Sequence, residues 1–162
     1  MIVSESRLLE LANRHAVTVD ALLVVAIALV ESAGESNAVR YEPGYKWTMD
    51  KCRRPAGCSK QTELSLQKHS WGLMQIMGAT ARSIGYSGWL SALTQPGTNM
   101  AAGCAYLEQL ATRYKVSTDL ISAYNAGYPR RREDGTYHNQ EYVDRVMDRR
   151  LTLQSMRDKG LF

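Results

Sequence analysis

ALLVVAIALV, residues 21–30, is the stretch of sequence that decides the fold. The run is apolar on every face, which is typical of a helix enclosed by the rest of a domain. A parallel strand is the alternative because Val and Ile are enriched in strands, but the length and the alanines favour a helix. The run is about half the ~20 residues that cross a bilayer, so no transmembrane helix is expected. We therefore predict a buried central helix that leads directly into Glu31.

The composition around this helix is that of a globular protein. The chain has 162 residues, of which 44% are hydrophobic and 22% charged, and it contains 12 glycines and four prolines without a low-complexity tract. These values exclude collagenous and mostly disordered classes and predict one domain over residues 1–162. The net charge of +4 favours an anionic partner, either nucleic acid or a carboxylate-bearing polymer.

The flanking sequence predicts a mainly α protein. Helical periodicity occurs in residues 4–16, 80–84, 99–114, 118–126 and 139–156. Ser4 and Thr18 are expected to cap helices, and Gly127 is expected to end one. The first of these segments is amphipathic, so no secretory signal peptide is expected. Residues 37–67 predict a long loop or a small irregular lobe, with any sheet confined to residues 40–67.

Glu31 is the first candidate for chemistry. A carboxyl group at the end of a buried helix lies in a low dielectric, which raises its pKa. Such a group stays protonated near neutral pH, as a general acid requires when it donates a proton to the oxygen of a leaving sugar. The alternative is a solvated acid at a helix end, although an acid there opposes the helix dipole.

Three motifs support the catalytic interpretation. They are ESAGESNAV at residues 31–39, SWGLMQIM at residues 70–77 and AYNAG at residues 123–127. In their order and spacing, residues 18–150 resemble the soluble lytic transglycosylases and the related goose-type lysozymes. This resemblance implies an α+β lysozyme-like fold and a glycosidase that cleaves the β-1,4 bond between N-acetylmuramic acid and N-acetylglucosamine in peptidoglycan.

The resemblance also implies a substrate-binding cleft. It indicates Gln75 and Met77 as cleft residues, whereas core packing is the alternative for one of Met74 and Met77. Further substrate-binding candidates are the Ser70 hydroxyl, near the acid, and the two residues Tyr124 and Asn125. Their phenol and amide would orient the acid and hold an N-acetyl group, unless they form only a core contact and a helix cap.

The implied reaction requires only one carboxylate. Glu31 would protonate the leaving oxygen, the substrate's acetamido group would stabilise the developing positive charge, and Glu31 would then act as base. Removing the proton of the muramic 6-hydroxyl gives a 1,6-anhydro product, whereas activating water gives hydrolysis. In both cases the scheme differs from the usual pair of acids.

Glu42 is the candidate second carboxylate. It lies in RYEPGY, residues 40–45, among aromatic side chains suited to sugars, and segments of this kind resemble phage-encoded members of the family. An ion pair with Arg40 is the alternative role. Asp50 and Glu63 are weaker candidates because only their position recommends them.

Two positions differ from the family pattern. Arg40 stands where many members have a serine, and His138 stands where many have an acid four residues before a Tyr-Val pair, here Tyr142 and Val143. The resemblance therefore does not specify the hydrogen bonds around Glu31.

The remaining clusters leave alternatives open. Cys52 and Cys58 could form a disulfide or, with His69, bind zinc, although three irregularly spaced ligands fall short of a structural zinc set. The basic run at residues 130–132 is either a solvated loop or a site for carboxylates of wall peptides or for nucleic acid phosphates.

These observations lead to a set of expectations about partners. The substrate is peptidoglycan glycan strands, other virion proteins are further candidate partners, and the chain is a monomer. No cofactor, metal, nucleic acid or membrane insertion is expected. The site of action is the virion or the host periplasm and cell wall. The competing classes are a non-catalytic wall-binding or virion protein, and a DNA-binding helical pair at residues 80–93.

Overall fold

The computed structural model describes all 162 residues and has seven α-helices, a short 3-10 helix (η1) and a three-stranded sheet. The mainly α fold class is thereby confirmed. The elements in chain order are α1 (Glu5–His15), α2 (Ala21–Ser32), β1 (Val39–Tyr41), α3 (Lys60–Gln67), β2 (His69–Trp71), β3 (Ile76–Met77), α4 (Gly78–Ser83), η1 (Leu90–Thr94), α5 (Pro96–Ala111), α6 (Ser117–Ala126) and α7 (Gln140–Asp158).

Helix α2 is the central helix that its apolar run predicts. Every side chain from position 22 to 28 is buried, and the helix packs against α1 and α7. The expected cap was wrong: Asp20, not Thr18, accepts a hydrogen bond from the Leu22 N–H at 3.1 Å. The Thr18 hydroxyl instead donates to Glu108 of α5, because the linker between α1 and α2 lies against that helix. None of the helices is both long enough and apolar enough to span a membrane.

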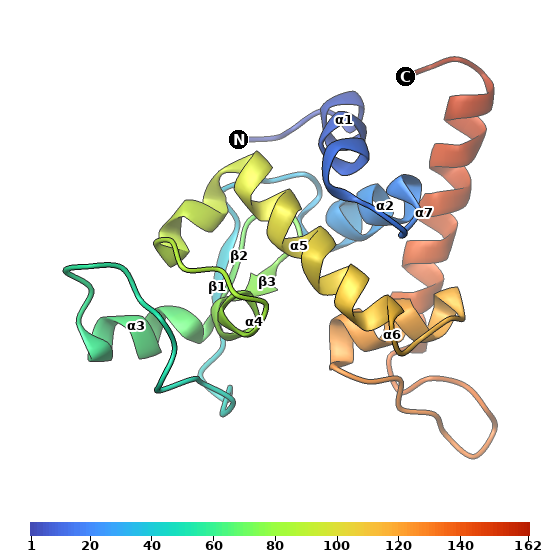
Figure 1. Ribbon diagram of the computed structural model, residues 1–162. Coiled ribbons are helices and arrows are strands. Elements are labelled where there is room, and N and C mark those ends of the chain that lie inside the picture. Colours follow the sequence, from blue (N-terminus) through green and yellow to red (C-terminus); the bar gives the residue numbers. More distant parts are fainter.

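Helix α5 runs between two parts of the molecule. The sheet, α3 and α4 form a small lobe at one end, and α2, α6 and α7 lie at the other (Figure 1). The main core surrounds α2 and receives side chains from α1, α5, α6 and α7. A second, smaller core lies under the sheet and is formed by Trp71, Ile76, Ala81, Leu90, Leu93 and Ala102.

The sheet is antiparallel, with strand order β1-β2-β3. Its register places Arg40 opposite Ser70, and Ser70 opposite Met77. These three side chains therefore lie side by side across the sheet. The expectation that any sheet lies within residues 40–67 was wrong, because β2 and β3 lie beyond it and are joined by the tight turn of the second motif.

The small lobe also contains a helix that the periodicity did not predict. Helix α3 begins after Ser59, whose hydroxyl accepts from the Thr62 N–H at 3.1 Å. The residues that it buries are Glu63 and Gln67, one turn apart. Because these inward residues are polar, an apolar pattern could not reveal the helix.

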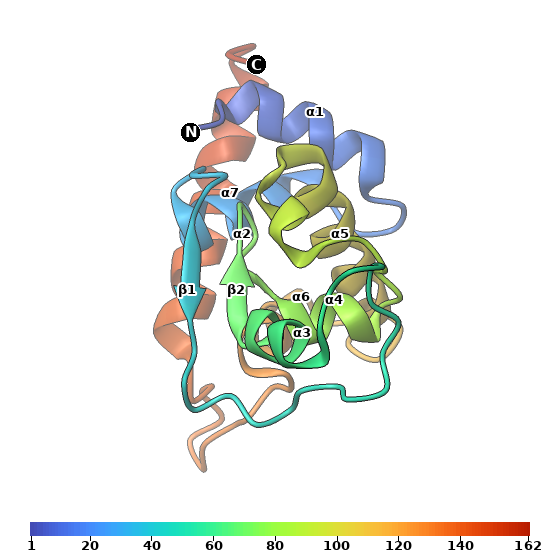
Figure 2. The same cartoon turned by 90° about the vertical axis from the view of Figure 1, so that its left-hand side faces the viewer.

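The loop of residues 42–59 follows the outer edge of the small lobe and is attached to α3 (Figure 2). The Gln67 side-chain amide accepts a hydrogen bond from the Met49 N–H at 2.6 Å and donates one to the Met49 carbonyl at 3.1 Å. Cys52 and Cys58 are free thiols in the structure, and both donate to the Glu63 carboxylate. Glu63 in turn is held by Arg82 of α4. A polar cluster therefore anchors this loop.

Candidate active site

The three sequence motifs meet at the backbone of Leu73 and Met74. The Ser32 hydroxyl, at the end of α2, donates to the Leu73 carbonyl at 2.7 Å. The Tyr124 hydroxyl, in α6, donates to the Met74 carbonyl at the same distance. One hydroxyl from each helix thus fixes the turn between β2 and β3, which explains why the motifs occur together.

This turn depends on a glycine and on a buried amide. Gly72 has φ +67°, and a Cβ there would lie 2.3 Å from the Leu93 carbonyl oxygen, so no other residue fits. The fully buried Asn99 accepts from the Met74 N–H at 2.8 Å and donates to the carbonyls of Trp71 and Leu93 at 2.7 Å. Sequence reasoning missed Asn99 because it lies on the buried face of a helix, without a motif around it.

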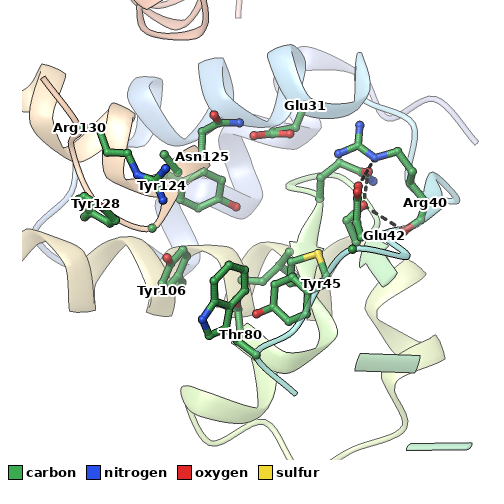
Figure 3. Close-up of a pocket in the computed structure, with 18 residues that line it drawn as sticks. Glu31, Arg40, Glu42, Tyr45, Thr80, Tyr106, Tyr124, Asn125, Tyr128 and Arg130 are labelled. Atoms are coloured by element: carbon green, nitrogen blue, oxygen red, sulfur yellow. Dashed lines mark hydrogen bonds and ion pairs between the residues drawn. The ribbon is translucent and has the colours of Figure 1, made fainter. Parts of the chain in front are cut away.

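A cleft of about 700 Å³ opens next to this turn (Figure 3). All of the predicted site residues line it, so the structure brings together positions from four elements (α2, β2, β3 and α6), from the turn between β2 and β3, and from the loop that contains Glu42. Of the two methionines, Met77 lines the cleft and Met74 belongs to the core. The lining residues are Glu31, Arg40, Glu42, Gly44, Tyr45, Trp47, Ser70, Gln75, Ile76, Met77, Thr80, Tyr106, Tyr124, Asn125, Ala126, Gly127, Tyr128 and Arg130.

Glu31 lies half-buried where α2 reaches the cleft. Burial raises the pKa of its carboxyl, while a hydrogen bond from Tyr142 and the positive charges of Arg40 and Arg145 act in the opposite direction. The net effect is a raised pKa, which favours the protonated form. The carboxyl can therefore carry a proton to a bound substrate.

The hydroxyl that holds Glu31 comes from α7. Tyr142 donates to Oε1 of Glu31 at 2.7 Å. Tyr124 was expected to orient the acid, but its hydroxyl instead donates a hydrogen bond to the Met74 carbonyl. Sequence reasoning assigned Tyr142 only to an apolar helix face. The available signal was its phenol hydroxyl, which needs a partner when the ring is buried.

Glu42 forms the ion pair that was the alternative to a catalytic role. Nε of Arg40 lies 2.5 Å from Oε1 of Glu42, and both residues line the same cleft as Glu31 (Figure 3). The carboxylate is therefore within the cleft, but it is neutralised by its neighbour in the unbound protein.

The Ser70 and Gln75 side chains hold each other at the cleft. The Ser70 hydroxyl donates to Oε1 of Gln75 at 2.9 Å, and Nε2 of Gln75 donates to the carbonyls of Ala38 and Gly72 at 3.1 and 2.9 Å. Gln75 itself has φ +45°. Both ends of this amide are thus occupied within the protein, so it shapes the cleft.

Asn125 has a free donor. Its Oδ1 accepts from Nδ2 of Asn139 at 3.0 Å, whereas its own amide nitrogen has no hydrogen-bond partner in the protein. An exposed N–H₂ group in a sugar cleft can donate to the carbonyl of an acetamido group.

Aromatic side chains complete the walls of the cleft. Tyr45 and Trp47 pack edge to face with ring centroids 5.4 Å apart, and 72% of Trp47 is exposed. Tyr106 and Tyr128 line the cleft as well. Such rings offer flat apolar faces next to hydroxyls, which suits sugar rings. No group of three or more His, Cys, Asp or Glu side chains in the structure is placed to hold a metal ion.

The comparisons with known proteins agree with this geometry. The family model of the transglycosylase SLT domain matches residues 9–144, which include all three motifs and the Tyr142 position. No curated protein and no solved structure matches the chain.

Proposed function

The chain belongs to the transglycosylase SLT domain family, and from this membership we propose that Glu31 is the general acid, and then the base, of a reaction forming 1,6-anhydromuramic acid ends. Members of the family are peptidoglycan lytic transglycosylases, so the chain is an enzyme that degrades peptidoglycan. A non-catalytic wall-binding protein is therefore the weaker interpretation.

The observation that carries the proposal is the environment of Glu31. Its raised pKa favours a protonated carboxyl that can donate to the glycosidic oxygen as the bond from C1 of muramic acid breaks. The acetamido group of the same sugar stabilises the positive charge at C1, and Asn125 is available to hold that group. The Glu31 carboxylate then takes the proton of the 6-hydroxyl while that oxygen bonds to C1.

Mass spectrometry of muropeptides released from purified peptidoglycan tests this role. The wild type should release products lighter by one water than reducing-end muropeptides. Glu31→Gln should lose roughly 10²- to 10⁴-fold in rate, because it keeps the shape and removes the transferable proton. Glu35→Gln, outside the cleft, is the matched control and should retain activity. Near-normal activity of a folded Glu31→Gln variant would contradict the assignment.

Hydrolysis of the same bond by water is the second candidate, because Glu42 lines the same cleft as Glu31. Reducing-end products from the wild type would favour it. Glu42→Gln should then lose activity while retaining substrate binding. If Glu42 serves only Arg40, the same variant should change the rate modestly.

We further propose that the enzyme is encoded by a phage and acts from the virion or in the host periplasm and cell wall. The RYEPGY segment and the wall substrate support this proposal. Peptide mass spectrometry of purified phage particles and of fractionated infected cells would test it, and confinement of the chain to the cytoplasm throughout infection would oppose it.

A further inference from the structure

The three consecutive arginines between α6 and α7, residues 130–132, make different contacts. Arg131 pairs with Asp119 at 2.8 Å and also donates to the Tyr137 hydroxyl at 2.7 Å. Arg132 donates to the carbonyls of Tyr137 and His138 at 2.5 and 3.0 Å. These two side chains are therefore used in holding their own loop.

Arg130 is not used in this way. Its guanidinium forms no ion pair and no side-chain hydrogen bond, and it lies over the Tyr128 ring, 4.6 Å from the centroid. Both residues line the cleft, at the end away from Arg40 and Glu42 (Figure 3). This cation–π contact holds the guanidinium over the ring, while its N–H groups remain without a hydrogen-bond partner in the protein.

The charge balance of the cleft makes this side chain distinctive. The other lining cation, Arg40, is paired with Glu42, and the raised pKa of Glu31 favours its neutral form. Arg130 is thus the unpaired positive charge among the lining residues. A guanidinium edge matches a carboxylate, which accepts two parallel hydrogen bonds from it.

The sugar rings of the substrate carry no charge. Its carboxylates are on the lactyl side of muramic acid, either in the stem peptide or, where the peptide has been removed, on the lactyl group itself. We propose that Arg130, positioned by Tyr128, binds such a carboxylate and selects muramic acid substrates that carry it in the stem peptide. The proposal rests on the peptidoglycan substrate of the family and not on the role of Glu31.

The test compares the wild type with Arg130→Gln on soluble glycan strands bearing stem peptides and on strands stripped of them by an amidase, which leaves the lactyl carboxylate. Binding of chitohexaose, which has no carboxylate, is measured in the Glu31→Gln background as a readout independent of turnover. Arg130→Gln should raise KM for stem-bearing strands about 10-fold or more with kcat little changed, the size expected for a lost charge-assisted contact. Arg130→Lys should be intermediate, because a single ammonium lacks the planar fork.

Arg53→Gln is the matched control, since this exposed arginine of loop 42–59 makes no ion pair and lies outside the cleft lining. This variant should leave KM for both kinds of strand and the binding of chitohexaose unchanged. If Arg130→Gln raises KM only for stem-bearing strands, the result supports the stem peptide as the source of the carboxylate. If the variant raises KM equally for stripped strands, the result supports the lactyl group as the source and overturns the stem selectivity.

An unchanged KM, or an equal weakening of chitohexaose binding, would overturn the carboxylate site. Failure of the Glu31 assignment would be recognised separately, as near-normal activity of Glu31→Gln, and would leave the Arg130 comparison measurable.

Discussion

Replacing Arg82 with Met should destabilise the protein because it removes the partner of a buried carboxylate. The Arg82 and Glu63 side chains are only 1% and 3% exposed. Nε and Nη2 of Arg82 donate to the two carboxylate oxygens at 2.7 and 2.9 Å. Nη1 donates to the carbonyls of Tyr86 and Gly88 at 2.7 and 2.8 Å, so the variant also loses two bonds to the following loop.

The expected loss is large. Breaking a buried pair by removing one partner costs about 3–5 kcal/mol, which is at least a fifth of the stability of a domain at about 5–15 kcal/mol. Burial alone would raise the pKa of Glu63, but hydrogen bonds from Arg82 and Gln67 lower it below its usual value. In the wild type, this carboxylate therefore stabilises the fold at pH values above its unfolded pKa, and this stabilisation is lost as the pH falls through the folded pKa. Without Arg82, burial dominates and disfavours the ionised carboxylate. The loss of unfolding free energy caused by Arg82→Met should therefore be greatest at neutral pH and should shrink in acid, where Glu63 is protonated.

Urea denaturation of Arg82→Met, Glu63→Gln and the double variant, at neutral and acidic pH, measures this effect. The double variant should recover part of the loss of Arg82→Met, because it no longer buries an unpaired charge. A loss under about 1 kcal/mol, typical of a solvent-exposed pair, would refute the reasoning. So would a double variant that loses the full sum of the two single losses.

Three other predictions concern single sites. Tyr142→Phe removes a hydrogen bond that lowers the pKa of Glu31, so the alkaline limb of the pH profile of kcat/KM should move to higher pH; an unmoved limb would contradict this. Gly72→Ala should cost about 2–4 kcal/mol in thermal denaturation, whereas Gly44→Ala, where a Cβ meets no atom within 4 Å, should change stability little. For Glu108, burial would raise the pKa, but hydrogen bonds from Thr18 and the neighbouring backbone lower it to about 2. Glu108→Gln should therefore be less stable than the wild type at neutral pH. It should also lack the decline in stability that the wild type shows as the pH falls from 4.5 toward 2. Profiles of stability against pH that match in the two proteins would contradict this.

The parts of the fold that the sequence predicts well depend on local patterns. An apolar run without a polar face can only be buried, so residues 21–30 predict the central helix directly. Gly127, with φ +81°, ends α6 where expected. Helix α3 was missed because its buried side chains, Glu63 and Gln67, are polar and are satisfied by the distant Arg82 and the Met49 backbone.

The site divides in the same way. Glu31 and the motifs at residues 70–77 and 123–127 could be recognised from residue types and spacing alone. That Tyr142 holds Glu31 while Tyr124 holds the Met74 carbonyl was decided only by the packing of α7 and α6 against the centre of the molecule. The same holds for Arg130, since its neighbours in sequence carry the same charge and only the folded loop leaves this one unpaired. Periodicity states which face of a helix is buried, whereas the partner that this face meets depends on how distant segments pack, because hydrogen bonds and ion pairs act only over a few ångströms.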